Sequence, residues 1–400
     1  MKIAIISAQI FDSSVGGVEN HIRFIGKELL KKGHELRLFK PTWEKENEGK
    51  IKEIDGLKIE FVYLGKRPYD LRNLTGKKIG VYLAGFLNKA SYSFSSAQLV
   101  QAVDTWNPEL VWQHDFSSSW RATRKLSKKY PVVLTNHTGE YLMLQNRLVG
   151  RWLLPWILKH YSAVIGPSKE LTPAFFSSSH TIHNGVDTSL FFPLSPEEKK
   201  NLRNDLYNEN KSKFIVFCPR RWAPTKGVIF LAQAIREISR TPDLKNKFLF
   251  VFAGSDYDVY PKYASEINET LKGSESIVLK LGNVDVYRMI SYYQSADLVI
   301  IPSLMEAVSL SALESMACKT PVLSTNVGGM PEIIKEGETG YLIHPANSDE
   351  IKNSLIAIEK GSERAKISEN AEKMVKEKYS WQAIANLTEK VLMSAVNALH

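Results

Sequence analysis

Short, continuously apolar runs alternate with stretches of helical periodicity along most of the chain. Runs rich in valine and isoleucine without polar alternation are typical of strands covered on both faces, as in a parallel sheet. In the first half of the chain, the expected strands are residues 3–7, 36–39, 58–63, 110–113, 132–136 and 163–166. In the second half, they are residues 214–218, 248–253, 277–281, 298–302 and 321–324. An apolar stripe at helical spacing separates the first two runs and consists of Val18, Ile22, Ile25 and Leu29.

This strand–helix–strand order predicts parallel sheets with right-handed crossovers. The alternation stops at residues 184–213, which are rich in Asn, Lys, Glu and Pro, and it starts again at residue 214. A chain of 400 residues is long enough for two or three domains. The pattern predicts an α/β protein with two doubly wound, Rossmann-like domains that face each other across a cleft. We expect the domains at residues 1–190 and 191–380, with the last residues, 381–400, as a separate helix.

The composition excludes several classes of protein. Apolar residues make up 44% and charged residues 24% of the chain, which is ordinary for a globular protein and excludes a disordered or fibrous one. No stretch reaches the roughly 18 consecutive apolar residues that a membrane span needs. The N-terminus predicts a strand rather than a signal peptide, so we expect a cytoplasmic protein. Cys218 and Cys318 lie in apolar surroundings and are expected to be buried thiols, and no Cys/His cluster has zinc-finger spacing.

The net charge of +9 comes entirely from residues 1–190, whereas residues 191–400 are neutral. The electrostatic field of this positive charge favours anionic partners. Basic residues cluster at 66–78 and 121–129 and flank a Trp-rich segment at 147–159. These segments suit contact with an anionic membrane surface. The alternative is that the basic residues lie on solvated helix faces and that the aromatic residues pack in the core. Nucleic acid is not expected as a partner because no recognised binding motif accompanies the charge.

A glycine pair, Gly16 and Gly17, follows the first expected strand and precedes the first helix. Glycine lets the backbone come close to a ligand, and the N-terminus of a helix offers N–H groups to an anion. The segment lacks the G-x-G-x-x-G pattern, so it does not predict a dinucleotide site. A tight turn is the alternative interpretation.

A cationic loop follows the first strand of the second half. It carries Arg221 and Lys226, five positions apart. A guanidinium fork and an ammonium group together suit a diphosphate. The alternative is two solvated loop cations.

Two glutamates flank a short helix in the segment 302–334. Glu306 lies in the loop after a strand, the helix begins near Ser309 or Leu310, and Glu314 lies in its second turn. One carboxylate at this edge of a sheet can accept hydrogen bonds from both hydroxyls of a ribose, and a second can hold the hydroxyls of a sugar. The helix N-terminus between them can receive phosphate. The alternative is two exposed glutamates beside an amphipathic helix whose buried side is Leu310, Leu313 and Ala317.

Together these segments resemble the large family 4 of glycosyltransferases, which has the GT-B fold. Glu306 and Glu314 match its Glu-x7-Glu signature. The likeness extends over most of the chain, through GGVENHIRFIGKELLKKGHEL, NGVDTSLFFP, RWAPTKG, LGNV, PSLMEAVSLSALESMACKTPVL, NVGGMPEII and YSWQAIA. Several ordered motifs are far more specific than any one of them alone.

The resemblance implies a role for particular residues. It implies a donor diphosphate site formed by Arg221, Lys226, Gly16, Gly17, Ser309 and Leu310. It further implies that Glu314 and the backbone of Val284 bind the nucleoside. Glu306 and His137 are expected at the reacting centre, although a structural loop histidine is the alternative for His137. The helix from Trp381 is expected to cross back onto the first domain.

The chain departs from the family in one place. The family usually has Gly-Phe-Gly-Leu after the first glutamate, whereas this chain has Ala307-Val308-Ser309-Leu310. The loss of both glycines narrows the space in which backbone approaches the ligand, which affects the pose and identity of the sugar more than the reaction class. Asp256 and Asp258 form a D-x-D pattern that binds a divalent metal in another glycosyltransferase fold. Because the cations at 221 and 226 can already neutralise a diphosphate, we expect no metal and no other cofactor.

The expected enzyme is a retaining, hexosyltransferase-type glycosyltransferase that uses a nucleotide diphosphate sugar, with a UDP-sugar as the first expectation. A glycan or lipid-linked acceptor would bind the basic first domain, in surface polysaccharide or glycolipid assembly at the inner membrane face. One alternative is an epimerase or phosphorylase of the same fold. Another is a catalytically silent carbohydrate-binding relative, which the altered 307–309 loop supports best.

Overall fold

The computed structural model describes residues 1–7, 17–66, 92, 95–114, 119–137, 148–254 and 259–398. The chain divides into two compact units: Met1–His183 together with Trp381–His400, and Asn184–Ser380. The first break thus lies at residue 183 rather than at the expected residue 190. The cause is that Val186 forms a parallel bridge with Ser380, and the Phe191 ring is buried in the core of the second unit.

The described strands of the first unit form one eight-stranded sheet in the order β3-β4-β2-β1-β5-β6-β7-β8. They are β1 (Lys2–Ile6), β2 (Glu35–Thr42), β3 (Ile51–Ile54), β4 (Leu57–Tyr63), β5 (Leu110–His114), β6 (Val132–Thr135), β7 (Ala163–Gly166) and β8 (Ser179–Thr181). Neighbouring strands are parallel except β3 and β4, which form an antiparallel hairpin. Asp55 and Gly56, both with positive φ, make its turn. β3 and β8 were not predicted from the sequence, because both are short and lack an apolar run.

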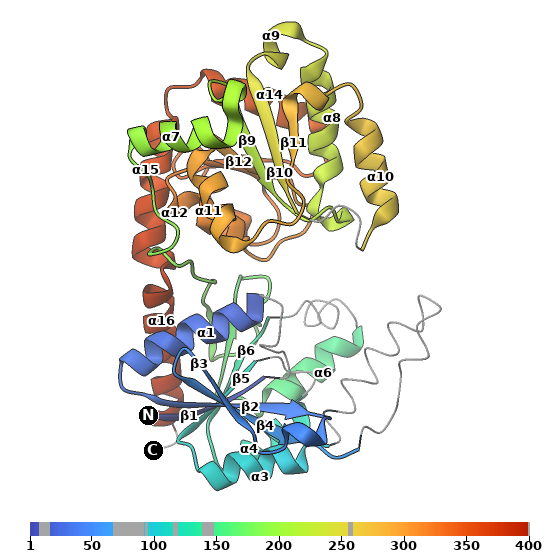
Figure 1. Cartoon of the computed structure of the whole chain (residues 1–400). Coiled ribbons are helices and arrows are strands. Elements are labelled where there is room, and N and C mark those ends of the chain that lie inside the picture. The colour runs from blue at the N-terminus through green and yellow to red at the C-terminus, as the bar shows by residue number, and fades with distance from the viewer. Residues whose placement is uncertain are drawn as a thin grey trace. The chain divides into compact units, whose positions relative to one another are not determined.

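The helices of the first unit include one from the far end of the chain. They are α1 (Gly17–Lys31), α3 (Ala97–Trp106), α4 (Trp120–Leu126), α6 (Leu148–Leu158) and α16 (Trp381–Asn397), with a 3₁₀ turn at Lys45–Asn47. α16 lies beside α1 (Figure 1). The rings of Phe24 and Trp381 stack with centroids 5.2 Å apart, and His34 Nε2 lies 2.7 Å from Glu389 Oε1. The apolar face of α16 therefore completes the core of the first unit.

The second unit contains a parallel sheet in the order β11-β10-β9-β12-β13-β14 among the described residues. Its strands are β9 (Phe214–Pro219), β10 (Phe248–Ala253), β11 (Val278–Lys280), β12 (Leu298–Ile301), β13 (Val322–Thr325) and β14 (Tyr341–Ile343). The sequence analysis predicted all of these except β14, which is only three residues long and partly exposed.

Helices cover both faces of this second sheet. They are α7 (Pro196–Tyr207), α8 (Val228–Ser239), α9 (Pro242–Lys245), α10 (Pro261–Thr270), α11 (Val286–Ser295), α12 (Leu310–Ala317), α13 (Met330–Ile333), α14 (Ser348–Lys360) and α15 (Arg364–Met374). Shorter turns lie at Asn208–Asn210, Pro224–Lys226, Glu275–Ile277 and Val375–Tyr379. Figure 1 shows α8 beside α14, and these helices pack with α10 on Val216 and Ile300. On the other face, α11 and α12 pack on Phe217 and Val299. Because alternate residues of β9 and of β12 enter different cores, these central strands are apolar throughout, and the parallel sheet covered by helices confirms the predicted α/β class.

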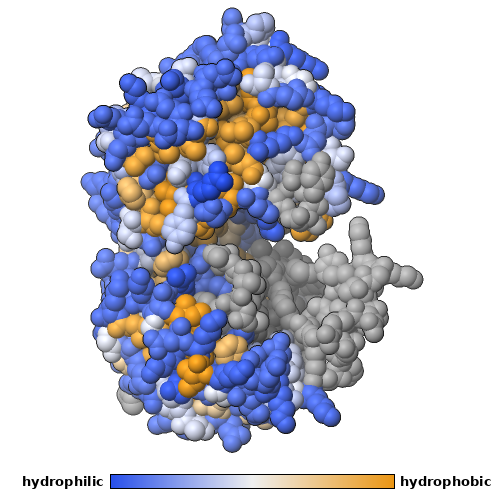
Figure 2. Space-filling model, in the orientation of Figure 1, coloured by the Kyte–Doolittle hydropathy of each residue, from blue (hydrophilic) through white to orange (hydrophobic). Residues whose placement is uncertain are grey.

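The drawn surface of each unit is mainly hydrophilic, with smaller apolar patches between the polar areas (Figure 2). Such a mixture is ordinary for a globular protein. No helix within the described ranges is both long and apolar enough to cross a bilayer. Cys218 and Cys318 are free and buried, as expected, and burial raises the pKa of the Cys218 thiol to about 12.

Candidate functional site

The predicted site residues of the second unit gather at the carboxyl edge of its sheet. β9 and β12 are parallel neighbours, so the loops that follow them leave the sheet side by side. Arg220 directly follows β9, and Ser303 lies two residues after β12. The backbone N–H of Leu304 donates to the carbonyl of Thr225 at 2.8 Å and ties the two loops together.

Glu306 is the centre of this edge. Its side chain is 9% exposed, and its Oε1 accepts hydrogen bonds from three donors. These are the Arg220 guanidinium, Lys226 Nζ at 2.7 Å and Ser303 Oγ at 2.9 Å. A single carboxylate thus holds two cations beside one another, and the three charged groups together carry one positive charge.

The sequence prediction paired Lys226 with Arg221, but the structure brings Arg220 into this cluster. Arg220 is buried and bonds Glu306, whereas Arg221 is exposed. Arg221 still lies near enough to Lys226 to lower its pKa, so it adds positive charge at the rim. Sequence reasoning missed Arg220, although its place directly after a strand was a usable signal.

The pKa shifts follow from burial and from these ion pairs. Burial, with the nearby Arg220, lowers the pKa of Lys226, although Glu306 opposes the shift. Burial alone would raise the pKa of Glu306, but Arg220 and Lys226 outweigh it and the net shift is downward. The carboxylate of Glu306 is therefore ionised at neutral pH.

Arg220 Nε and Ser309 Oγ are buried polar atoms at this edge that have no hydrogen-bond partner among the described residues. Ser309 is the N-cap residue of α12, but its side chain makes no capping bond. The first N–H groups of any helix also lack partners within that helix. These donors, together with the cations, form a place that suits an anion.

Glu314 lies in the second turn of α12 and is partly buried. Its Oε2 accepts a hydrogen bond from the Tyr293 hydroxyl of α11 at 2.7 Å. Burial raises the pKa of Glu314, although the Tyr293 hydroxyl and the positive charge of Arg220 oppose the shift. Leu310, expected on the buried side of α12, is partly exposed, while Leu313 and Ala317 are buried.

Two glycines allow the loops to pack this closely. A Cβ on Gly227, which has φ +62°, would lie 1.9 Å from the carbonyl oxygen of Pro302. A Cβ on Gly329 would lie 2.0 Å from the carbonyl oxygen of Ala307. The segment Ala307-Val308-Ser309 therefore fits without a glycine of its own, because Gly329 in the neighbouring loop leaves room for it.

Val284 follows β11 at the same sheet edge and is partly buried against the core of the second unit. Its predicted contact with a base remains a prediction. Asp256 and Asp258 lie outside the described residues.

The predicted residues of the first unit lie at the corresponding edge of its own sheet. Gly17 is the first residue of α1, whereas Gly16 lies outside the described residues. His137 lies two residues after β6 and does not stand alone. Its Nε2 is 2.9 Å from Nδ1 of His114, the last residue of the neighbouring strand β5.

His21 of α1 completes a group of three histidines. Its ring centroid lies 4.7 Å from that of His137 and 5.7 Å from that of His114. Burial lowers the pKa of His114 and of His137 well below the usual range, and the neighbouring imidazoles lower both further. The two rings are therefore neutral at neutral pH. Sequence reasoning named only His137, because the other two are distant in the chain.

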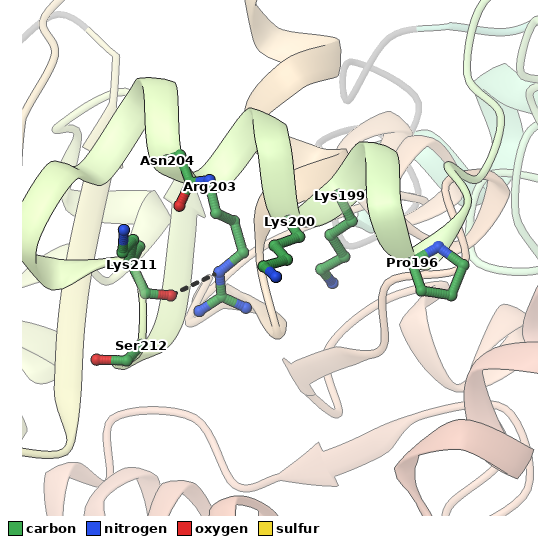
Figure 3. A pocket seen from close by; sticks show the side chains of 7 residues that line it. All are labelled: Pro196, Lys199, Lys200, Arg203, Asn204, Lys211 and Ser212. Carbon is green, nitrogen blue, oxygen red and sulfur yellow. Dashed lines mark hydrogen bonds between the residues drawn. The ribbon is translucent and has the colours of Figure 1, made fainter.

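A hollow beside α7 carries several cations but has a structural role (Figure 3). The Arg203 guanidinium donates to the carbonyls of Lys211 and Lys213 and to Asp297. Lys199 Nζ donates to the carbonyl of Ala296 at 2.6 Å. These bonds fasten α7 to the strand edge, so the two side chains are committed to the fold.

Comparisons with known proteins match both units. The family model described as Glycosyltransferase Family 4 matches residues 15–190, and the model described as Glycosyl transferases group 1 matches residues 199–374. The chain is 28% identical to an uncharacterized glycosyltransferase of Methanocaldococcus jannaschii over 418 aligned residues, which cover 100% of both chains. It is 23% identical to the MMP alpha-(1->4)-mannosyltransferase of Mycolicibacterium hassiacum, covering 99% of this chain and 98% of the relative.

A solved structure with a similar backbone is that of HepE from Anabaena in complex with UDP. The TM-score is 0.72 at 21% identity, and the match covers 98% of this chain and 100% of HepE. The two chains share the GT-B type of fold that the sequence predicted.

Proposed function

Because the chain belongs to glycosyltransferase family 4, we propose that it transfers a sugar from a nucleotide diphosphate sugar to a hydroxyl of a glycan or lipid-linked acceptor. It is a glycosyltransferase enzyme of the hexosyltransferase type. The bond between the anomeric carbon and the diphosphate oxygen breaks, a bond from that carbon to the acceptor oxygen forms, and the proton of the acceptor hydroxyl leaves with the nucleoside diphosphate. We propose retention of anomeric configuration, as the family resemblance implies.

The observation that carries the proposal is the cluster in which Glu306 holds Lys226 and Arg220 beside the N-terminus of α12. Negative charge develops on the leaving diphosphate, so pre-positioned cations and N–H groups stabilise the transition state more than the ground state. Lys226, the Ser309 hydroxyl and Arg220 Nε, which has no hydrogen-bond partner within the described ranges, supply such donors. The exposed Arg221 adds a further cation.

The two glutamates are proposed to hold the rest of the donor. Arg220, Lys226 and Ser303 all bond Oε1 of Glu306, so Oε2 is the oxygen proposed to contact the transferred sugar. Tyr293 bonds Oε2 of Glu314, which leaves Oε1 to accept from the ribose hydroxyls. Val284 is proposed to meet the base, and UDP is the proposed nucleotide because the similar fold of HepE was solved with UDP.

In the first unit, His137 is proposed to lie at the reacting centre, with Gly16 and Gly17 next to the donor. Because Nε2 of His137 faces His114, Nδ1 is the atom available to a substrate. We propose that the acceptor binds the first unit, whose basic excess favours an acidic or lipid-linked molecule.

We further propose that the first unit binds an anionic membrane surface through α4 and α6. Trp152 is 85% exposed and Trp156 is 41% exposed, although both are large apolar residues. The ring of Trp156 lies 5.1 Å from that of Trp120 on α4, and Lys159 Nζ lies 5.8 Å from its centroid. Aromatic rings flanked by exposed basic residues are typical of a surface that rests on acidic headgroups.

Release of nucleoside diphosphate from a panel of nucleotide sugars, with and without glycan and glycolipid acceptors, tests the function. The wild-type chain should release nucleoside diphosphate in an acceptor-dependent manner, and Lys226→Ala should reduce kcat/KM by at least tenfold. Lys272→Ala is the matched control, because Lys272 pairs with Glu269 on the exposed surface of the same unit.

The same assay separates the alternatives. An epimerase would isomerise the donor without an acceptor, and a silent carbohydrate-binding relative would bind a nucleotide sugar without turnover. Either result, or equal activity in the Lys226 variant and its control, would overturn the proposal.

A further inference from the structure

Three histidines that lie far apart in the sequence share one place in the first unit. His114 ends β5, His137 follows β6, and His21 lies on α1 after β1. Since β1, β5 and β6 are parallel neighbours, their carboxyl ends meet at one edge of the sheet. One ring nitrogen of each histidine lies within 4.8 Å of one ring nitrogen of both others.

We propose that His21, His114 and His137 bind a single transition-metal ion, of which Zn²⁺ is the best fit. Imidazole nitrogen is the commonest protein ligand for zinc, and three histidines with one open position form a known type of zinc site. The described part of the chain contains no other group of three potential ligands this close together. The site shares His137 with the proposed reacting centre, but the metal binding can be measured without sugar transfer.

The spacing of the nitrogens fits such an ion. In a tetrahedral site with Zn–N bonds of about 2.0–2.1 Å, ligand nitrogens lie about 3.3 Å apart. One nitrogen of each ring lies within 4.8 Å of one nitrogen of both other rings, which is only slightly farther apart than in a formed site. Small ring rotations would therefore bring all three into coordination distance.

A second observation points to a ligand here. The His114 ring is fully buried, and its Nε2 has no hydrogen-bond partner among the described residues. A buried polar atom without a partner is costly unless something binds there.

The surroundings suit a rigid site. The Trp112 ring lies 4.4 Å from the His114 ring, and the Trp381 ring lies 5.9 Å from the His21 ring. These aromatic rings limit the movement of the ligands and keep the site apolar. The ion would join α1, β5 and β6, so binding should stabilise the first unit by mass action.

The experiment is a titration of the untagged, metal-stripped full chain with Co²⁺, followed by its visible absorption, and then with Zn²⁺ in competition. The wild-type chain should bind one equivalent. His21→Gln, His114→Gln and His137→Gln should each weaken binding at least tenfold and abolish the rise in Tm with Zn²⁺. His180→Gln and His344→Gln, at exposed histidines, are the controls and should bind as the wild type does.

Since a Gln variant could fail to fold, X-ray absorption of the zinc-loaded wild-type chain provides a second measurement. We expect about three imidazole nitrogens at about 2.0 Å from the zinc. The proposal is overturned if the wild-type chain binds no metal, if sulfur or only oxygen ligands surround the zinc, or if a control variant loses as much affinity as the three site variants. Because these readouts are metal binding and not sugar transfer, they stand whether or not the proposed function holds.

Discussion

Lys226 Nζ lies 2.7 Å from Glu306 Oε1, although eighty residues separate them in the chain. The same oxygen also accepts a hydrogen bond from Arg220. Removing one partner of a buried ion pair leaves the other charge uncompensated, which is strongly destabilising. The balance of this cluster therefore controls both the stability of the second unit and its attraction for an anion.

Replacing Glu306 with Gln should destabilise the second unit by about 3 kcal/mol, because the buried Arg220 loses its charge partner. The extra positive charge should at the same time tighten the binding of free nucleoside diphosphate. Urea unfolding and calorimetry with UDP measure the two effects. Glu237→Gln, at an exposed glutamate paired with Arg240, should cost less than about 1 kcal/mol. Equal losses of unfolding free energy in the two variants would show that the buried cluster does not contribute to stability.

Replacing Glu314 with Gln should have a pH-dependent effect on stability. Burial raises the folded-state pKa of Glu314 above its ordinary value of 4.5. The protonated group therefore contributes stability below pH 4.5, and this contribution is lost as the pH rises through the folded-state pKa. Glu314→Gln, which carries no charge at any pH, should be more stable than the wild type at neutral pH and equally stable in acid. Denaturant midpoints of both proteins at neutral pH and in acid measure this difference in stability. A difference that is the same at the two pH values would contradict the role of Glu314 protonation.

The same Glu314 variant should bind the nucleotide donor more weakly. Tyr293 bonds Oε2 of the carboxylate and leaves Oε1 for the ribose, whereas an amide has a single acceptor oxygen for both partners. A rise in donor KM together with a gain in stability would separate a binding role from a structural one.

Two serines on or next to α12 form a matched pair for mutation. Ser309 Oγ is buried without a partner among the described residues, whereas Ser315 Oγ donates to the carbonyl of Thr320 at 2.9 Å. Ser309→Ala should preserve stability and weaken donor binding by about tenfold to a hundredfold, the size of a hydrogen bond to a charged group. Ser315→Ala should lose about 1–2 kcal/mol of stability and leave the donor KM unchanged. Urea unfolding and steady-state kinetics would show the reverse pattern if Ser309 served only the fold.

Replacing Trp152 and Trp156 together with Ala should reduce sedimentation of the chain with anionic phospholipid vesicles by several-fold. The residual binding should fall further at high salt, because the basic residues act through a screened field. Tyr287→Ala, at a tyrosine 75% exposed in the second unit, should sediment as the wild type does. No sedimentation of the wild-type chain at low salt would remove the membrane proposal and leave the transferase proposal intact.

The positions of most strands along the chain were predictable, because those strands are buried on both faces and so carry continuous apolar runs. The runs that became β7 and β10 were placed at their observed bounds. The short strands β3, β8 and β14 were not predictable, since pairing with a neighbour rather than burial defines them. The residue types of the candidate site were also readable, because Glu306 and Glu314 lie within one continuous segment.

By itself, the sequence determined the fold class and the neighbourhood of the donor site, because both depend on local apolar periodicity and on motifs of adjacent residues. Only the tertiary structure decided that Arg220 rather than Arg221 bonds Glu306, because that choice depends on which side chain the end of β9 turns toward β12. The tertiary structure also decided that His21 and His114 lie next to His137. Such a group forms through the lateral order of parallel strands, and no spacing along the chain records that order.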